Sequence, residues 1–264
     1  MNERVVVVNA GKMNYDHLLD FSVLSNDVQV YDDSTNAELI ERIQGATVVV
    51  TKEIPVGPEL LSQFPESVKL IVEAGTGYNN IDLDAARAKG ITVCNIPAYS
   101  TERVAHTAIM MLLNFASTMQ QQIGMLARGD RSNFTKHLQV PHTEVNGKTL
   151  GIIGAGHIGM AVVKVARALD MNILIHTRTP KEDSEGIRYV SLDELLAQSD
   201  YISLHCPLND KTKHLINKDT IAKMKSSAVI INTGRGALIN EADLCDALAA
   251  KRIAGAGLDV QEVE

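Results

Sequence analysis

The stretch from Lys148 to Arg178 constrains the fold of this chain more than any other. Its apolar, β-branched run Thr149–Ile153 is typical of a buried parallel strand. Three glycines follow in the pattern G-x-G-x-x-G, and apolar residues then recur at helical spacing as far as Leu169. A second apolar run, Ile173–Ile175, is typical of another strand. The stretch therefore predicts a strand, a tight turn, a helix and a strand within one βαβ unit.

The three glycines, Gly154, Gly156 and Gly159, have different physical uses. The first permits the tight turn, the second lets the backbone approach a pyrophosphate, and the third lets the helix pack closely on the strand. The free N–H groups and the positive end of the helix then bind the anion. The competing interpretation is a glycine-rich turn in an unrelated α/β protein. The context of strand, turn and helix favours a dinucleotide site.

Composition limits the class of protein. A length of 264 residues suffices for two domains, and 45% hydrophobic with 22% charged residues is typical of a soluble globular protein. A net charge of −7 without a basic block argues against nucleic acid as a partner. The longest apolar stretch, Ala108–Leu113, is too short to span a bilayer, and the N-terminus lacks a signal peptide pattern. Cys94, Cys206 and Cys245 are scattered, which suggests neither a metal site nor a disulfide framework and fits the reducing cytoplasm.

Expected strands alternate with expected helices along the chain, which predicts an α/β fold of two doubly wound parallel-sheet domains. The alternation breaks at residues 95–98, so we expect a first, flavodoxin-like domain over residues 1–98 and a second, Rossmann dinucleotide-binding domain over residues 99–264. A helix is expected around Tyr15 to Phe21, and one long helix over Ser100–Leu126. The expected strands are Val5–Val8, Val28–Tyr31, Thr47–Thr51, Leu70–Val72, Ile91–Cys94, Thr149–Ile153, Ile173–Ile175, Tyr201–Leu204, Ala228–Asn232 and Ala254–Val260.

Two residues indicate which dinucleotide binds. Sites that prefer NAD usually carry Asp or Glu at the end of the second strand of the βαβ unit, where the carboxylate bonds the ribose 2′-hydroxyl. This chain has Thr177 and Arg178 there. Arg178 would attract a 2′-phosphate, and the hydroxyl could bond it. We therefore expect NADP(H) to be preferred over NAD(H), the alternative being that Arg178 is a solvated loop residue.

Ligands in such sheets bind at the carboxyl ends of the strands. Gly75-Thr76-Gly77 follows one expected strand and offers bare backbone N–H groups that suit a carboxylate, although such a loop is equally compatible with a simple turn. Arg235 follows another buried strand, between two glycines. A guanidinium binds a carboxylate through two parallel hydrogen bonds and keeps its charge, so this position favours a ligand contact over an ordinary surface arginine.

Several stretches together resemble the D-isomer-specific 2-hydroxyacid dehydrogenase family, most of all its phosphoglycerate, glyoxylate and hydroxypyruvate reductases. They span most of the chain from Leu70 onward, in the family's order and spacing. The stretches are EAGTGYNNIDLDAARAKGITVCNIP, GKTLGIIGAGHIG, ISLHCPLNDKTKHLI and VIINTGRGALINEADLCDALAAKRIAGAGLDVQEVE.

The resemblance implies an oxidoreductase that transfers a hydride between NAD(P)H and a small 2-keto or 2-hydroxy acid of the D-series, without a metal. It implies that Arg235 binds the keto acid and polarises its carbonyl. It also implies that Glu264 pairs with a catalytic histidine and raises its pKa, and that Gly75, Thr76 and Gly77 hold the substrate carboxylate. The further cofactor contacts that it implies are His157, Ile158, Cys206, Thr233, Gly234 and Asp259.

One departure from the family leaves an alternative open. The family's proton donor is a histidine that follows the glutamate at the position of Glu264, whereas all eight histidines of this chain precede Glu264. We expect the acid to lie in a C-terminal tail outside these 264 residues. Without it, the alternative is a catalytically impaired dinucleotide-binding protein or fragment that acts as a sensor or scaffold. The family also suggests a homodimer, formed through the long helix and the arm that follows it.

Overall fold

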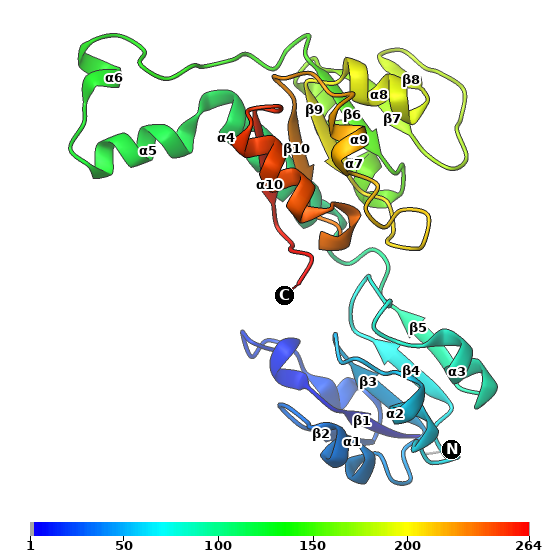
Figure 1. Cartoon of the computed structure of the whole chain (residues 1–264). Helices are drawn as coiled ribbons and strands as arrows, with labels where there is room; N and C mark the ends of the chain where they lie inside the picture. Colours follow the sequence, from blue (N-terminus) through cyan, green and yellow to red (C-terminus); the bar gives the residue numbers. More distant parts are fainter. Residues whose placement is uncertain (1–2, 264) are drawn as a thin grey trace. The chain divides into compact units, whose positions relative to one another are not determined.

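The structure is a computed structural model, and it describes residues 3–263. The chain divides into two compact units, residues 1–99 and 100–264, each built on its own parallel sheet (Figure 1). The α/β class with two parallel sheets is the one that the sequence predicts, so this prediction is confirmed.

The first unit has five parallel strands in the order β2-β1-β3-β4-β5, which is the flavodoxin-like order. Alternate residues of β1 point to opposite faces of this sheet: Val6 packs with the three helices, and Val5 and Val7 pack with residues 10–24. The elements are β1 (Arg4–Val7), β2 (Asp27–Val30), α1 (Asn36–Arg42), β3 (Val48–Thr51), α2 (Pro58–Ser62), β4 (Leu70–Glu73), α3 (Leu83–Ala88) and β5 (Thr92–Asn95).

The second unit has six parallel strands in the order β11-β10-β9-β6-β7-β8. One face packs against α4 and α7, and the other against α8, α9 and α10, so that the sheet is buried on both sides (Figure 1). The elements are α4 (Thr101–Ser117), α5 (Met119–Ala127), α6 (Ser132–Thr135), β6 (Thr149–Ile153), α7 (His157–Ala168), β7 (Asn172–His176), β8 (Ile187–Tyr189), α8 (Leu192–Gln198), β9 (Tyr201–Leu204), α9 (Lys218–Ile221), β10 (Val229–Asn232), α10 (Glu241–Ala249) and β11 (Gly255–Leu258).

The prediction of one long helix over Ser100–Leu126 is wrong, because the helix breaks at Thr118. This residue has φ of +49° and ψ of +35°, a left-handed conformation that is strained for a β-branched side chain. Its hydroxyl donates a hydrogen bond of 2.6 Å to the carbonyl oxygen of Pro141, which helps to hold the bend. As a result α5 and α6 extend away from the sheet of this unit as an arm (Figure 1).

The helix expected around Tyr15 to Phe21 is also wrong. Residues 13–20 form turns and irregular backbone instead, between two short 3-10 turns, Ala10–Lys12 and Phe21–Leu24. Side chains compete with the backbone for its hydrogen bonds in this segment, since Asn14 Oδ1 accepts from the N–H of Leu19 and Asp20 accepts from that of Ser22.

Candidate active site

In the glycine turn after β6, one glycine has space for a side chain and the other two have none. Gly154 has φ of +103°, and a Cβ there would lie 2.6 Å from the backbone nitrogen of Cys206. A Cβ on Gly159 would overlap the carbonyl oxygen of Gly154, so α7 can pack on the turn only if this residue is glycine. Gly156 differs, because nothing lies within 4 Å of where its Cβ would be.

The open space at Gly156 lies at the N-terminus of α7. Gly156 is the N-cap of this helix, and no side chain caps it. His157 is exposed and Ile158 is half-buried in the first turn. Uncapped N–H groups beside a residue without a side chain fit the pyrophosphate of a dinucleotide. The residues present therefore fit a dinucleotide cofactor.

The next strand, β7, ends in polar residues. His176 Nδ1 lies 3.2 Å from the carbonyl oxygen of Val190. Thr177 is half-buried and Arg178 is exposed. The end of this strand thus carries a hydroxyl and a guanidinium, the two groups on which the expected preference for NADP(H) depends.

On the other side of β6, the loop after β9 places two side chains in uncharged states. Burial lowers the pKa of His205 to about 4, and its Nε2 lies 2.8 Å from Ser203 Oγ. Burial raises the pKa of Cys206 to about 11, so its thiol stays protonated at neutral pH. Cys206 is therefore a poor nucleophile and offers an uncharged side chain beside the glycine turn.

The loop after β10 carries Arg235 and is held by one buried amide. Asn232, which is fully buried, accepts the N–H of Gly234 at 3.0 Å and donates to the carbonyl oxygen of Arg235 at 2.9 Å. Arg235 is half-buried, and its Nη1 donates to the carbonyl oxygen of Gly234 at 2.8 Å. The hydroxyl of Thr233 is buried without a hydrogen-bond partner within residues 3–263.

The segment after β11 packs directly on the Arg235 loop. A Cβ on Gly236 would overlap the carbonyl oxygen of Gln261. Glu262 pairs with His214 at 2.6 Å, and the hydrogen bond from His214 lowers the pKa of this carboxyl. Asp259 is exposed, and its N–H donates to the backbone carbonyl oxygen of Asn232 at 3.0 Å. Glu264, the predicted partner of the catalytic histidine, lies outside the described residues.

The first unit carries its own candidate loop, which follows β4. Gly75 is buried, and Thr76 and Gly77 are half-buried. The end of β5 supports this loop, because Asn95 Nδ2 donates to the carbonyl oxygen of Thr76 at 2.8 Å and the N–H of Ile96 donates to that of Gly75 at 3.0 Å. Both contacts use carbonyl groups of the loop.

The structure brings the predicted residues of the second unit that lie within residues 3–263 to one edge of its sheet. The end of β9 contacts both functional loops: Gly154 packs on His205 and Cys206, and the Cβ position of Gly234 lies 3.5 Å from the carbonyl oxygen of Leu204. The glycine turn and the Arg235 loop therefore flank the same strand. Gly75, Thr76 and Gly77 belong to the other unit.

Within residues 3–263, no three His, Cys, Asp or Glu side chains lie close enough together to hold a metal ion. No helix in the same range has both the length and the apolar character needed to cross a membrane.

A sequence model described as the D-isomer specific 2-hydroxyacid dehydrogenase, NAD binding domain, matches residues 109–264, more than half of the chain. The chain belongs to the D-isomer-specific 2-hydroxyacid dehydrogenase family. A hydroxypyruvate reductase from Blautia hydrogenotrophica is 41% identical over 231 residues, which cover 86% of this chain and 71% of that relative.

Solved structures of this dehydrogenase family have the same fold. A glyoxylate reductase from Paecilomyes thermophila superposes with a TM-score of 0.86 at 34% identity, over 100% of this chain and 83% of the other. D-Lactate dehydrogenase from Aquifex aeolicus, solved with NAD and lactic acid, gives a TM-score of 0.85 at 32% identity, over 98% of this chain and 78% of that one.

Membership of this dehydrogenase family confirms the main functional prediction. The chain is an NAD(P)-dependent oxidoreductase with an NAD-binding domain, and its substrate is a small 2-hydroxy or 2-keto acid. The alternative of a sensor or scaffold without chemistry is not favoured, since these relatives are named reductases and dehydrogenases.

Sequence reasoning missed three residues that hold the dehydrogenase's loops in place. Asn232, Glu73 and Asn9 are each at most 1% exposed; the first two end strands, and Asn9 lies two residues after β1. The signal was present, because a polar residue at the end of an apolar run is a candidate for holding the loop that follows. Its partners could not be predicted, since they depend on how neighbouring strands are aligned.

Proposed function

We propose that the chain reduces a small 2-keto acid to its D-2-hydroxy acid with NADPH, the second unit binding the cofactor and the first the substrate carboxylate. One observation carries this proposal: the open N-terminus of α7 and the Arg235 loop flank the same strand, β9. An anion site and a permanent cation on one edge suit a phosphorylated cofactor and an acidic substrate. The test is the oxidation of NADPH by the full chain with hydroxypyruvate or glyoxylate. A rate no higher than without the keto acid would contradict the proposal.

The surroundings of Arg235 support the role that the family resemblance implies for it. Arg235 holds the 2-keto acid and stabilises the negative charge that develops on its carbonyl oxygen. Asn232 fixes the backbone on both sides of this arginine. The role of Glu264, to orient and charge a proton-donating histidine, rests on the family resemblance, because Glu264 lies outside the described residues. The cofactor, when bound, supplies the hydride.

The remaining cofactor contacts follow from their places on the sheet edge. Gly154, Gly156 and Gly159 shape the pyrophosphate site, with His157 and Ile158 at its helix N-terminus. Cys206 and Thr233 line the nicotinamide end as uncharged groups, beside Gly234. Asp259 stands at the end of the next strand.

We infer a preference for NADP(H) from the end of β7. Replacing Arg178 with alanine should weaken NADPH binding about tenfold to a hundredfold and leave NADH binding within twofold, because an arginine–phosphate hydrogen bond is worth about 1.5–3 kcal/mol and only NADPH carries the 2′-phosphate. Isothermal titration with each cofactor measures this. Lys181→Ala, an exposed residue in the same loop, is the matched control. Tighter binding of NADH than of NADPH by the unaltered chain would refute the inference.

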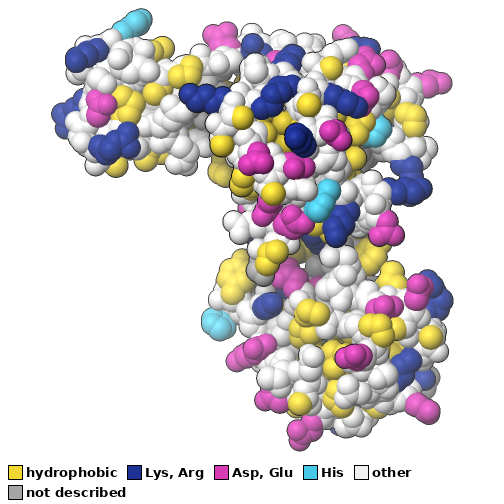
Figure 2. Space-filling view, viewed as in Figure 1, with side chains coloured by type: hydrophobic (Ala, Val, Ile, Leu, Met, Phe, Trp, Pro, Cys, Tyr) yellow, Lys and Arg dark blue, Asp and Glu magenta, His cyan; other side chains and the backbone are white. Residues whose placement is uncertain are grey.

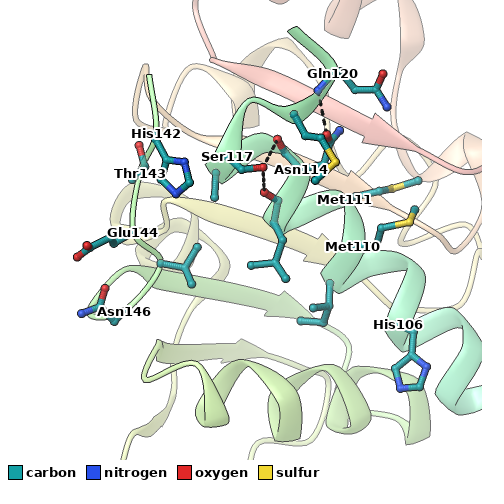
Figure 3. Close-up of a pocket in the computed structure, with 15 residues that line it drawn as sticks. His106, Met110, Met111, Asn114, Ser117, Gln120, His142, Thr143, Glu144 and Asn146 are labelled. Atoms are coloured by element: carbon teal, nitrogen blue, oxygen red, sulfur yellow. Dashed lines mark hydrogen bonds between the residues drawn. The ribbon is translucent and has the colours of Figure 1, made fainter. Parts of the chain in front are cut away.

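We also propose a homodimer formed through α4 and the arm. A cavity of about 800 Å³ lies beside α4, and Figure 3 shows Met110 and Met111 of that helix with His142 and Thr143 from the segment before β6. Hydrophobic side chains are visible on the surface of the arm in Figure 2. Exposed apolar groups on this scale mark an interaction surface. They are Met110, Leu113, Met119, Ile123, Leu126, Phe134 and Leu138.

Sedimentation equilibrium should therefore give twice the mass of the chain. Ile123→Asp should shift the protein towards the monomer, since a buried, unpaired charge is costly at an apolar interface. Leu18→Asp, which alters an exposed leucine of the first unit, should leave the dimer intact. A monomer at micromolar concentration for the unaltered chain would overturn the proposal.

We place the enzyme in the cytoplasm. The three cysteines are free in the structure, which fits a reducing compartment.

A further inference from the structure

Lys52 lies beside the loop that is proposed to bind the substrate carboxylate. It follows β3 directly, and the loop Gly75-Thr76-Gly77 follows the neighbouring strand β4. The Lys52 side chain is only 18% exposed, and its Nζ lies 3.8 Å from where a Cβ on Gly75 would be. The ammonium group is therefore held against the backbone of this loop.

A buried amide fixes the backbone of Lys52. Asn9, which is 1% exposed and lies two residues after β1, accepts the N–H of Lys52 at 3.0 Å and donates to its carbonyl oxygen at 2.6 Å. Both backbone groups of Lys52 are thus bonded to one side chain. Such an arrangement leaves the residue little freedom to move away from the strand end.

A buried carboxyl fixes the residues that follow. Glu73, at the end of β4, accepts the N–H of Glu53 at 3.0 Å and the Nδ2 of Asn80 at 2.9 Å. Asn80 also donates to the carbonyl oxygen of Ile54 at 2.8 Å. Glu53 itself has φ of +59°, a conformation that non-glycine residues seldom adopt and that its surroundings must hold in place. Burial raises the pKa of Glu73, because the charged form is poorly solvated there.

The ion pair that Lys52 makes does not by itself account for this arrangement. Lys52 Nζ lies 3.4 Å from Glu53 Oε1, and the side chain of Glu53 is 63% exposed. An ion pair with so exposed a partner contributes little to stability. An ammonium has three N–H donors, so the same group can hold a further acceptor.

We propose that Lys52 is a specificity-determining residue, whose ammonium donates a charge-assisted hydrogen bond to the carboxylate of the 2-keto acid beside the Gly75-Thr76-Gly77 loop. This inference rests on the proposed function. It restricts the substrates to keto compounds with an ionised carboxyl next to the carbonyl, and it excludes the corresponding amides and esters. The contacts of Asn9 and Glu73 keep the ammonium in place before substrate binds.

The test measures the affinity of the full chain for oxamate, a 2-keto acid analogue that is not reduced, by isothermal titration at saturating NADPH. Lys52→Met should weaken oxamate binding about tenfold to a hundredfold, the value of one lost charge-assisted hydrogen bond. Glu53→Gln should bind oxamate at least as tightly as the unaltered chain, because it removes only the competing carboxylate. Lys89→Met should leave oxamate affinity unchanged, because the Lys89 ammonium donates to the carbonyl oxygens of Ser62 and Phe64 in the same unit.

Two outcomes would overturn the proposal. One is oxamate affinity within twofold of the unaltered chain in Lys52→Met. The other is an equal loss in Glu53→Gln, which would assign Lys52 to a structural ion pair. Thermal unfolding monitors the fold of each variant, and Lys52→Gln replaces Lys52→Met if the latter does not fold. Failure of the unaltered chain to bind oxamate would contradict the proposed function itself, so the two failures are distinguishable.

Discussion

Replacing Arg235 with methionine is expected to lower kcat/KM for 2-keto acid reduction by about 10²–10³-fold, the range found when a single donor to a developing oxyanion is removed. The guanidinium would bond the substrate in the ground state and stabilise the charge that grows on its carbonyl oxygen during hydride transfer. The loss should therefore appear in kcat as well as in KM. Initial rates over a range of keto acid concentrations separate the two.

Lysine should not rescue this position. A lysine ammonium keeps the charge but cannot present two parallel N–H donors, so Arg235→Lys should still lose most of the activity. Arg188→Met is the matched control, because Arg188 lies in the same unit and pairs with the half-exposed Glu194. Dissociation constants for NADPH should be unchanged in all three variants. A kcat/KM within threefold of the unaltered enzyme in Arg235→Met would remove Arg235 from the active site.

Alanine substitutions at two glycines of the turn after β6 should have different effects on stability. Gly159→Ala is expected to lower the free energy of unfolding by about 1–3 kcal/mol, because its Cβ would overlap the carbonyl oxygen of Gly154 and force α7 off the strand. Gly156→Ala should change the free energy of unfolding by less than about 1 kcal/mol, because its Cβ meets nothing and its φ of −77° suits any residue. Urea unfolding measures both values.

Cofactor binding should fall in both glycine variants, but for different reasons. In Gly156→Ala, the methyl group occupies the space through which the pyrophosphate approaches, so NADPH affinity should fall at least tenfold while the fold is retained. In Gly159→Ala the loss follows from the displaced helix. Gly90→Ala, at a left-handed position in the first unit, is the control for a destabilised chain with an intact cofactor site. Unchanged NADPH affinity in Gly156→Ala would place the pyrophosphate elsewhere.

The parts of the fold that could be predicted are those set by local pattern. The apolar runs of β6, β9 and β10 are buried on both faces, so they read as strands without knowledge of their neighbours. The glycine pattern predicts the turn after β6 because the reasons for glycine at Gly154 and Gly159 are backbone geometry and close packing.

The parts that were missed depend on contacts between distant segments. The break of the long helix at Thr118 uses a bond to Pro141, 23 residues away, and the segment itself contains good helix formers. The short strand β8 was not expected, because Ile187–Tyr189 offers one buried residue and acquires its strand character by pairing with β7.

The residues of the candidate site likewise fall into those that local pattern predicts and those that depend on contacts between distant segments. Arg235 and Gly75 could be identified by their places after buried strands. Asn9 and Glu73 could not, because their partners lie on neighbouring strands: Asn9 bonds Lys52, and Glu73 bonds Glu53. Only the alignment of β1, β3 and β4 in one sheet brings these groups together.

The most direct test of the account follows the transferred hydrogen. The full chain is incubated with hydroxypyruvate and NADPH that carries deuterium at the transferable position of the nicotinamide, and the product is examined by mass spectrometry and chiral chromatography. The account predicts D-glycerate with one deuterium on C2. Glycerate without deuterium, the L-isomer, or no product at all would contradict it.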